Sequence, residues 1–151
     1  MIDRRSRLSA RLLIGLGLCL FPMAAFADPC TAPLPSPGTR FSGVVRYVGD
    51  GDGLCVGPRG RPDRWIEVCL ADFYAPELHE RGGEQAKQRL RSLVFGRTVA
   101  CVADHRSYDR IVAACTVDGK PLGDELRRRG GIEGGRAMPR KRRAAATPYP
   151  Y

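Results

Sequence analysis

The sequence predicts an α+β domain that is mainly β, namely a small closed barrel of five strands with a helix inserted after the third strand. Five short segments rich in β-branched and aromatic residues alternate with Gly, Pro and Asp turns. Between the third and fourth segments, apolar residues recur at helical spacing. The chain has 151 residues, 43% of them hydrophobic and 27% charged. This composition suits one globular domain and excludes a coiled coil or a wholly disordered chain.

The first three predicted strands follow one another closely. Residues 41–48 (FSGVVRYV) form the first strand, and the Asp-Gly-Asp-Gly sequence after it turns the chain sharply. Residues 53–58 (GLCVGP) and 64–73 (RWIEVCLADF) form the second and third strands around a loop rich in Gly and Pro. Together these segments make the first half of the predicted barrel.

The second half combines two helices with two strands. A helix is predicted over residues 82–96, where the apolar residues that share one face are Ala86, Leu90, Leu93 and Val94. Residues 98–104 (TVACVAD) and 110–117 (RIVAACTV) form the last two strands, joined by the short loop HRSY. Residues 122–130 (LGDELRRRG) form a closing helix, because a run of arginines followed by glycine is a favourable helix end.

Residues 1–27 have the form of an export signal. Four arginines lie within the first eleven residues, an apolar run follows, and the run ends in the small-x-small sequence AFA at 25–27. We therefore expect cleavage before Asp28 and a periplasmic or secreted protein with no stable membrane anchor. The alternative is a retained N-terminal anchor, which the short apolar run and its internal proline disfavour.

Two further segments flank the predicted barrel domain, which spans residues 41–132. Residues 28–40 form a leader with four prolines, and residues 133–151 form a tail that we expect to be disordered and basic. The tail carries five positive charges within eight residues. Two interpretations remain open: an arm that strengthens binding to DNA or RNA through counterion release, or a segment that binds anionic lipid or nothing.

The exported chain keeps five cysteines, which are Cys30, Cys55, Cys69, Cys101 and Cys115. Outside the cytosol such a density of thiols usually pairs, so we expect two disulfides and one free thiol. Cys101 and Cys115 lie at similar depth on neighbouring strands, so a bond or a buried contact between them is expected. Cys30 is a candidate to fasten the leader. A second hypothesis pairs Cys69 with Cys55 on the neighbouring strand.

Three blocks in this sequence, in order and at suitable distances, resemble the staphylococcal nuclease (thermonuclease) family of calcium-dependent nucleases. They are VGDGDGLCV, VCLADFYAPE, and the stretch from YDRIVAAC to DGKPLGDELRRRGGI. The resemblance covers roughly residues 41–132. It implies an OB-type five-stranded barrel with two or three helices packed on it.

The resemblance also implies a site for phosphodiester hydrolysis, which requires an activated water and stabilisation of the extra negative charge in the transition state. The family's metal-binding carboxylate corresponds to Asp52, with Asp50 as its supporting neighbour, and the metal-coordinating backbone carbonyl corresponds to Ala75. The glutamate that activates water corresponds to Glu77, and the phosphate-binding arginine corresponds to Arg110. Calcium is the cofactor that the family would supply.

Two positions depart from the family pattern and predict weak activity. The family's other arginine corresponds to Cys69, which lacks a planar charged fork, and its second metal-binding aspartate corresponds to Tyr74, a neutral phenol. Removing one preorganised donor lowers a rate by about 100- to 1000-fold. Asp72 lies two residues before Tyr74, so its carboxylate would start roughly 6 to 7 Å away and would need a moved metal or a bridging water.

These observations leave two functions open. The first is an exported, monomeric, nuclease-like protein that hydrolyses DNA or RNA weakly with calcium. The second is a catalytically inactive barrel that binds nucleic acid or another polyanion, or a disulfide-stabilised interaction module. Residues 1–27 hold four Arg and one Asp, so the net charge falls from +9 for the whole chain to +6 after cleavage, which permits polyanion binding in either case.

Overall fold

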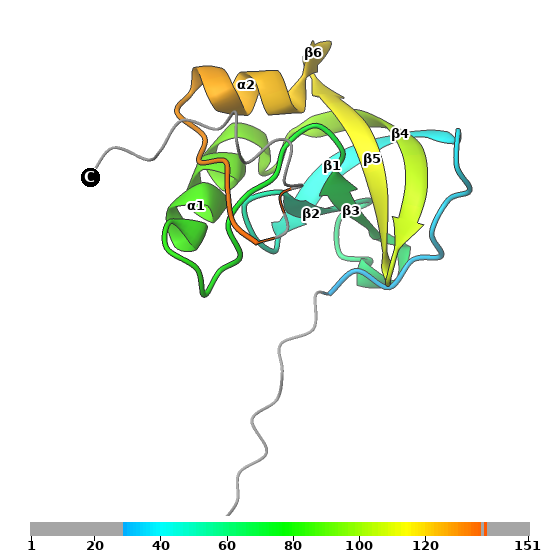
Figure 1. The fold of residues 1–151 in the computed structure, drawn as a ribbon. Helices are drawn as coiled ribbons and strands as arrows, with labels where there is room; N and C mark the ends of the chain where they lie inside the picture. Colours follow the sequence, from blue (N-terminus) through cyan, green and yellow to red (C-terminus); the bar gives the residue numbers. More distant parts are fainter. Residues whose placement is uncertain (1–28, 137, 139–151) are drawn as a thin grey trace, which may run out of the picture.

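The computed structural model describes residues 29–136 and 138 (Figure 1). The predicted signal peptide and most of the predicted basic tail lie outside these residues. Within them are the strands β1 (Arg40–Val48), β2 (Gly53–Val56), β3 (Ile66–Leu70), β4 (Thr98–Ser107), β5 (Arg110–Val117) and β6 (Lys120–Pro121). The helices are α1 (Gly83–Val94), α2 (Leu122–Arg128) and the short 3-10 helix η1 (Pro62–Arg64).

Five of the strands close into a ring, so the prediction of a mainly β, barrel-like fold is confirmed. The strand order is β3-β2-β1-β4-β5-β6, and β3 also pairs with β5 in parallel, which joins the two sides of the sheet. β1 pairs with both β2 and β4, and its register shifts between Val45 and Tyr47. Such a bulge bends a strand and increases its twist, which helps a short sheet to close.

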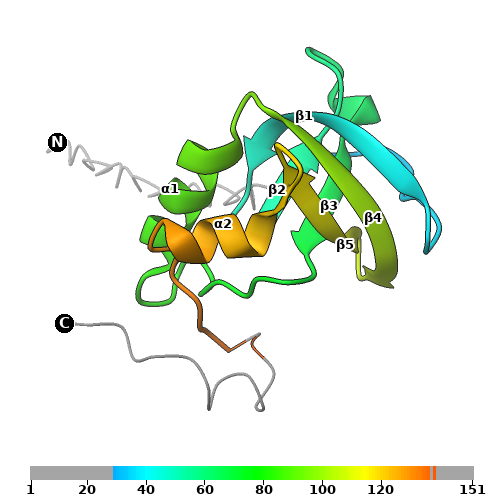
Figure 2. The same cartoon turned by 90° about the horizontal axis from the view of Figure 1, so that it is seen from above.

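The barrel interior and the inner faces of both helices form one hydrophobic core. The predicted helical face of α1, composed of Ala86, Leu90, Leu93 and Val94, is buried as expected. Leu122 and Leu126 of α2 are buried as well. Figures 1 and 2 show α1 and α2 beside each other on one side of the strand ring. In the described part of the chain, no helix is both long enough and apolar enough to cross a membrane.

Most of the predicted elements are present, but β3 covers Ile66–Leu70 rather than residues 64–73, the short strand β6 was not predicted, and one predicted loop is wrong. Residues 105–107 were predicted to belong to a loop, but they continue β4, because Ser107 still pairs with Arg110 across the hairpin. The turn therefore contains only Tyr108 and Asp109, and Tyr108 adopts a positive φ of 56°. The hydrophobic alternation in this stretch is weak, so the sequence did not indicate that pairing continues.

The cysteines form two disulfides, and the pairing corrects one hypothesis. Cys101 is bonded to Cys115 directly across the β4–β5 pair, as the strand arrangement predicted. Cys30 is bonded to Cys55 and fastens the leader to β2, whereas Cys69 is a free thiol. The hypothesis of a Cys55–Cys69 bond is therefore wrong, because the leader returns to β2 and occupies Cys55. Disulfides of this kind are typical of proteins from oxidising compartments.

The first residues of the predicted tail lie against the domain. We call residues 132–136 and 138 the C-terminal strap. Glu133 forms an ion pair with Arg127, and Arg136 forms one with Glu80. The side chain of Met138 is buried. The described fold thus continues for several residues past 132, while residues 139–151 lie outside the description.

Candidate functional site

The strand register brings the candidate site residues from separate segments to one region of the barrel. In the β2–β3 pair, Gly53 lies opposite Cys69, and in the β3–β5 pair Cys69 lies opposite Val112. Asp52 immediately precedes β2, and its carbonyl accepts a hydrogen bond from the Leu70 backbone N–H at 2.9 Å. The Asp-Gly turn and Cys69 are therefore neighbours, and β5 runs along the other side of β3.

The turn before β2 is shaped by its own side chains. Oδ1 of Asp50 accepts hydrogen bonds from the backbone N–H groups of Asp52, at 3.0 Å, and Gly53, at 2.5 Å. Gly51 packs against Ala75 and Ala86 so tightly that a Cβ atom at this position would collide with both methyl groups. The glycine therefore lets the turn approach α1 and the loop before it.

Asp52 connects this turn to the loop that carries Glu77. Its Oδ2 accepts a hydrogen bond of 2.8 Å from the backbone N–H of Ala75. Burial, followed by the neighbouring charges of Asp50 and Glu77, raises the pKa of Asp52 from 3.8 to about 7. At neutral pH the carboxyl is consequently divided between its protonated and ionised forms.

Glu77 is exposed, and its backbone is held in a tight turn. The Glu77 N–H donates to Oε2 of Glu80 at 3.1 Å, and the Glu80 N–H donates to the Glu77 carbonyl at 2.8 Å. The sequence patterns did not single out Glu80 as a functional residue. The sequence pattern that could have indicated it is an acidic residue three positions after Glu77 and shortly before a predicted helix, which is the spacing of a capping box.

Cys69 and Arg110 lie close enough to each other and to Asp50 for their charges to interact. Burial, followed by the charge of Asp52, raises the pKa of the Cys69 thiol to about 12, so this thiol is neutral at physiological pH. Arg110 is half-buried. Burial by itself would lower its pKa, but the nearby Cys69 and Asp50 raise it overall, so the guanidinium stays charged. Cys69 thus lies within electrostatic range of four charged groups, which are Asp50, Asp52, Glu77 and Arg110.

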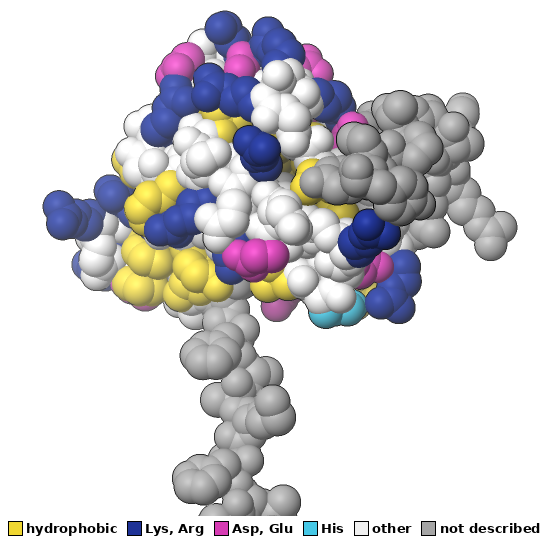
Figure 3. Space-filling model, turned by 90° about the vertical axis from the view of Figure 1, so that its left-hand side faces the viewer, with side chains coloured by type: hydrophobic (Ala, Val, Ile, Leu, Met, Phe, Trp, Pro, Cys, Tyr) yellow, Lys and Arg dark blue, Asp and Glu magenta, His cyan; other side chains and the backbone are white. Residues whose placement is uncertain are grey.

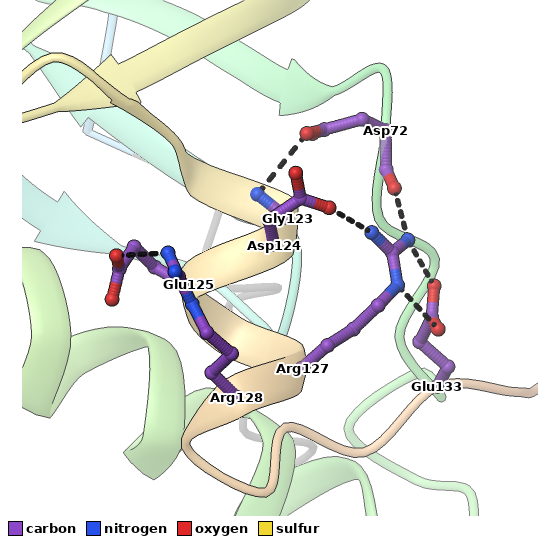
Figure 4. Close-up of polar contacts among 7 residues, drawn as sticks. All are labelled: Asp72, Gly123, Asp124, Glu125, Arg127, Arg128 and Glu133. Carbon is purple, nitrogen blue, oxygen red and sulfur yellow. Dashed lines mark hydrogen bonds and ion pairs between the residues drawn. The ribbon is translucent and has the colours of Figure 1, made fainter.

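Tyr74 and Asp72 lie in the segment after β3, and each is in contact with another part of the chain. The Tyr74 carbonyl accepts a hydrogen bond from the Gly134 N–H at 3.0 Å. The Asp72 carboxylate accepts one from the Gly123 N–H of α2 at 3.1 Å (Figure 4). Asp72 therefore supports the start of α2, and in this structure it does not replace a carboxylate at Tyr74.

The side chains present fit a calcium ion poorly. Ca²⁺ takes about six to eight oxygen ligands, several of them from ionised carboxylates. Oδ1 of Asp50 and Oδ2 of Asp52 already accept backbone hydrogen bonds, and the Ala75 carbonyl lies beneath Gly135 of the C-terminal strap. Among residues 29–136 and 138, no group of three or more His, Cys, Asp or Glu side chains is arranged to hold a metal ion. We therefore derive no catalytic step through calcium.

A scan of this chain against protein-family models finds no match, and a search of curated proteins finds no significant match either.

Proposed function

We propose that this protein is an exported, nuclease-like protein that hydrolyses phosphodiester bonds in DNA or RNA weakly. One observation carries the proposal: the charges of Asp52, Glu77 and Arg110, from three separate segments, all act on the thiol of Cys69, so the three groups lie in one region. Attack on a phosphodiester requires a base to activate water and positive charge to stabilise the transition state. Glu77 would be the base, Asp52 would fix the loop of that base, and Arg110 would supply the positive charge.

We further propose that the barrel is of the OB type and that the chain is related to the staphylococcal nuclease family. The ring order β1-β2-β3-β5-β4, with its closing parallel pair between β3 and β5, supports this assignment. Partly open five-stranded barrels of this kind commonly bind oligonucleotides on their surface. The two disulfides support a periplasmic or secreted location.

The proposed roles follow from exposure and charge. The exposed Glu77 accepts the proton of an attacking water, and the half-buried Arg110 donates hydrogen bonds to the phosphate oxygens. Asp52 holds the Ala75 N–H and so orients the segment that leads to Glu77. Because the Cys69 thiol is neutral, it contributes no positive charge to the transition state. This is the physical reason for expecting slow hydrolysis.

A second candidate function is a catalytically inactive barrel that binds nucleic acid or another polyanion, or an interaction module. The neutral Cys69 beside Arg110 favours it, since a single charged arginine can hold a phosphate without cleaving it. On the face over α1 and α2, Figure 3 shows basic side chains interspersed with acidic ones. Arg127 and Arg128 of α2, and Arg129 directly after it, form ion pairs with nearby carboxylates. Polyanion binding would therefore depend on the net charge and on Arg110.

The test is a cleavage assay on residues 28–151, which contain every described residue. Single-stranded and duplex DNA and RNA are incubated with calcium or with a chelator. Glu77→Gln removes the proposed base, and Glu84→Gln, an exposed residue of α1, is the matched control. A Cys69→Arg/Tyr74→Asp double variant introduces the two residues that the family resemblance implies.

Cleavage that is lost in Glu77→Gln and retained in Glu84→Gln supports the nuclease. We expect the double variant to be at least about 100-fold faster, because it adds a preorganised cationic donor. No cleavage by the natural chain, together with cleavage by the double variant, would favour the inactive binding protein. Absence of cleavage in both chains would overturn the nuclease proposal.

A further inference from the structure

The C-terminal strap lies directly on the loop that carries Glu77. The Gly134 N–H donates to the Tyr74 carbonyl at 3.0 Å. Gly135, with a φ of +84°, is so close to the loop that a Cβ atom would lie 2.8 Å from Cα of Pro76 and 3.2 Å from the Ala75 carbonyl oxygen. The missing side chain of Gly135 therefore allows backbone to pack on backbone at this point.

The strap is anchored on both sides of this contact. Nε and Nη2 of Arg127 in α2 bind the two carboxylate oxygens of Glu133 at 2.9 and 2.7 Å, and Nη2 also donates to the Asp72 carbonyl (Figure 4). Ile132 and Met138 are buried, with 9% and 3% of their surface exposed. The strap is thus a packed part of the domain with a defined position relative to the loop.

Glu80 joins the strap to the loop through one carboxylate. Its Oε1 accepts a hydrogen bond of 2.8 Å from Nε of Arg136, and the Arg136 backbone N–H approaches both oxygens at 3.3 Å. Oε2 accepts the backbone N–H of Glu77 at 3.1 Å. Arg136 first, and then the Glu77 N–H, lowers the pKa of Glu80, so this carboxylate remains ionised.

We propose that Glu80 and Arg136 are positioning residues that hold Glu77 in place for its reaction. This inference rests on the proposed function, because it assigns a role to residues around the proposed base. Asp52 fixes the loop at Ala75, upstream of Glu77, and the Glu80–Arg136 pair fixes it downstream. Since Glu77 is itself exposed, its position depends on this backbone frame. Displacing a reacting group by about 1 Å can lower a rate about 100-fold.

The experiment compares four variants of residues 28–151. Arg136→Met removes the charge and the Nε–H donor, Arg136→Lys keeps the charge, and Glu80→Ala removes the shared carboxylate. Arg89→Met removes an exposed arginine of α1 whose side chain has no hydrogen bond or ion pair among the described residues, and it serves as the matched control. Two quantities are measured: hydrogen exchange of the peptide covering residues 74–80, and kcat and KM for oligonucleotide cleavage. Kinetics use the Cys69→Arg/Tyr74→Asp background if the natural chain is too slow.

We expect Arg136→Met and Glu80→Ala each to speed exchange in residues 74–80 about tenfold and to lower kcat about tenfold, with KM changed less than about twofold. An added Glu80→Ala/Arg136→Met variant should be no worse than Glu80→Ala alone, because Glu80→Ala already removes the carboxylate that binds both Arg136 and the Glu77 N–H. Arg136→Lys should recover much of both effects, and Arg89→Met should change neither.

Unchanged exchange in Arg136→Met would overturn the inference, and so would a change in KM alone or an equal loss in Arg89→Met. These results are distinguishable from failure of the proposed function. If no background cleaves, the nuclease proposal fails while exchange still decides whether the Glu80–Arg136 pair holds the loop. Unchanged exchange in that case overturns the inference as well.

Discussion

The backbone N–H of Ala75 donates a 2.8 Å hydrogen bond to Oδ2 of Asp52, 23 residues earlier in the chain. This bond connects the turn before β2 to the loop that carries Glu77. The accepting carboxyl is buried beside Asp50, so the proton on Asp52 affects both the stability of the fold and the charge of the candidate site.

The raised pKa of Asp52 predicts a specific dependence of stability on pH. The pKa is about 7 in the folded chain and 3.8 ordinarily, so the folded state binds the proton more tightly than the unfolded state. The free energy of unfolding should therefore fall as the pH rises from about 4 to about 7, by roughly 1.4 kcal/mol per unit of pKa difference. Asp52→Asn keeps an acceptor for the Ala75 N–H without the charge and should remove this decline.

Urea unfolding of both chains between pH 4 and pH 8, in the presence of a chelator, measures the effect. The exposed Asp109 provides the control, because Asp109→Asn should leave the decline intact. A constant stability difference between the natural chain and Asp52→Asn over this range would contradict the prediction.

Removing the Cys101–Cys115 disulfide should lower the free energy of unfolding by a measurable amount. The Cys101–Cys115 bond closes a segment of 14 residues, for which chain entropy predicts about 3 kcal/mol. A Cys101→Ala/Cys115→Ala variant should lose about this amount in urea unfolding. A non-reduced digest should yield linked peptides containing Cys30 with Cys55 and Cys101 with Cys115. A linked peptide containing Cys69 would refute the observed pairing.

The free thiol of Cys69 should react slowly in the folded chain. With a pKa of about 12, only roughly one thiol in 10,000 is ionised at pH 8, and the thiolate is the reactive form. We expect alkylation by iodoacetamide to be about 1000-fold slower in the native chain than in urea, where the thiol has its ordinary pKa of 9.0. Equal rates in the two states would show that the site does not shield Cys69.

Tyr108 at the tip of the β4–β5 hairpin should be replaceable with a gain in stability. It is 97% exposed and adopts a φ of 56°, which is unfavourable for residues with a Cβ atom. Tyr108→Gly should raise the free energy of unfolding by up to about 1 kcal/mol. The same change at Val102, a strand residue on β4, is the contrasting control and should lower stability. A loss in Tyr108→Gly would indicate that the ring makes contacts beyond those of an exposed turn.

Local sequence patterns were sufficient to predict most elements of the fold. Both α-helices and the five ring strands appear near their predicted positions, and β5 matches residues 110–117 fully. The reason is that apolar periodicity and Gly or Pro turns act over a few residues. The contact between Cys101 and Cys115 was also predictable, since their strands are consecutive and antiparallel.

Contacts between distant segments had no such local pattern. The pairing of Cys30 with Cys55 depends on the path of the Pro-rich leader, so the predicted strand positions pointed to Cys69 as the partner of Cys55. The contact between Arg136 and Glu80 could not be predicted either, because these residues are 56 positions apart. The sequence around Arg136 has the composition of a polar, basic tail.

What the sequence by itself determined was the set of elements and the chemical groups offered to the site, namely Asp50, Asp52, Glu77 and Arg110. Only the tertiary structure decided how these groups meet: β3 pairs in parallel with β5, Asp52 accepts the Ala75 N–H, and the C-terminal strap covers the Glu77 loop. The physical reason is that periodicity encodes which face of an element is buried. Which partners then meet is selected by ring closure and by close packing at particular glycines.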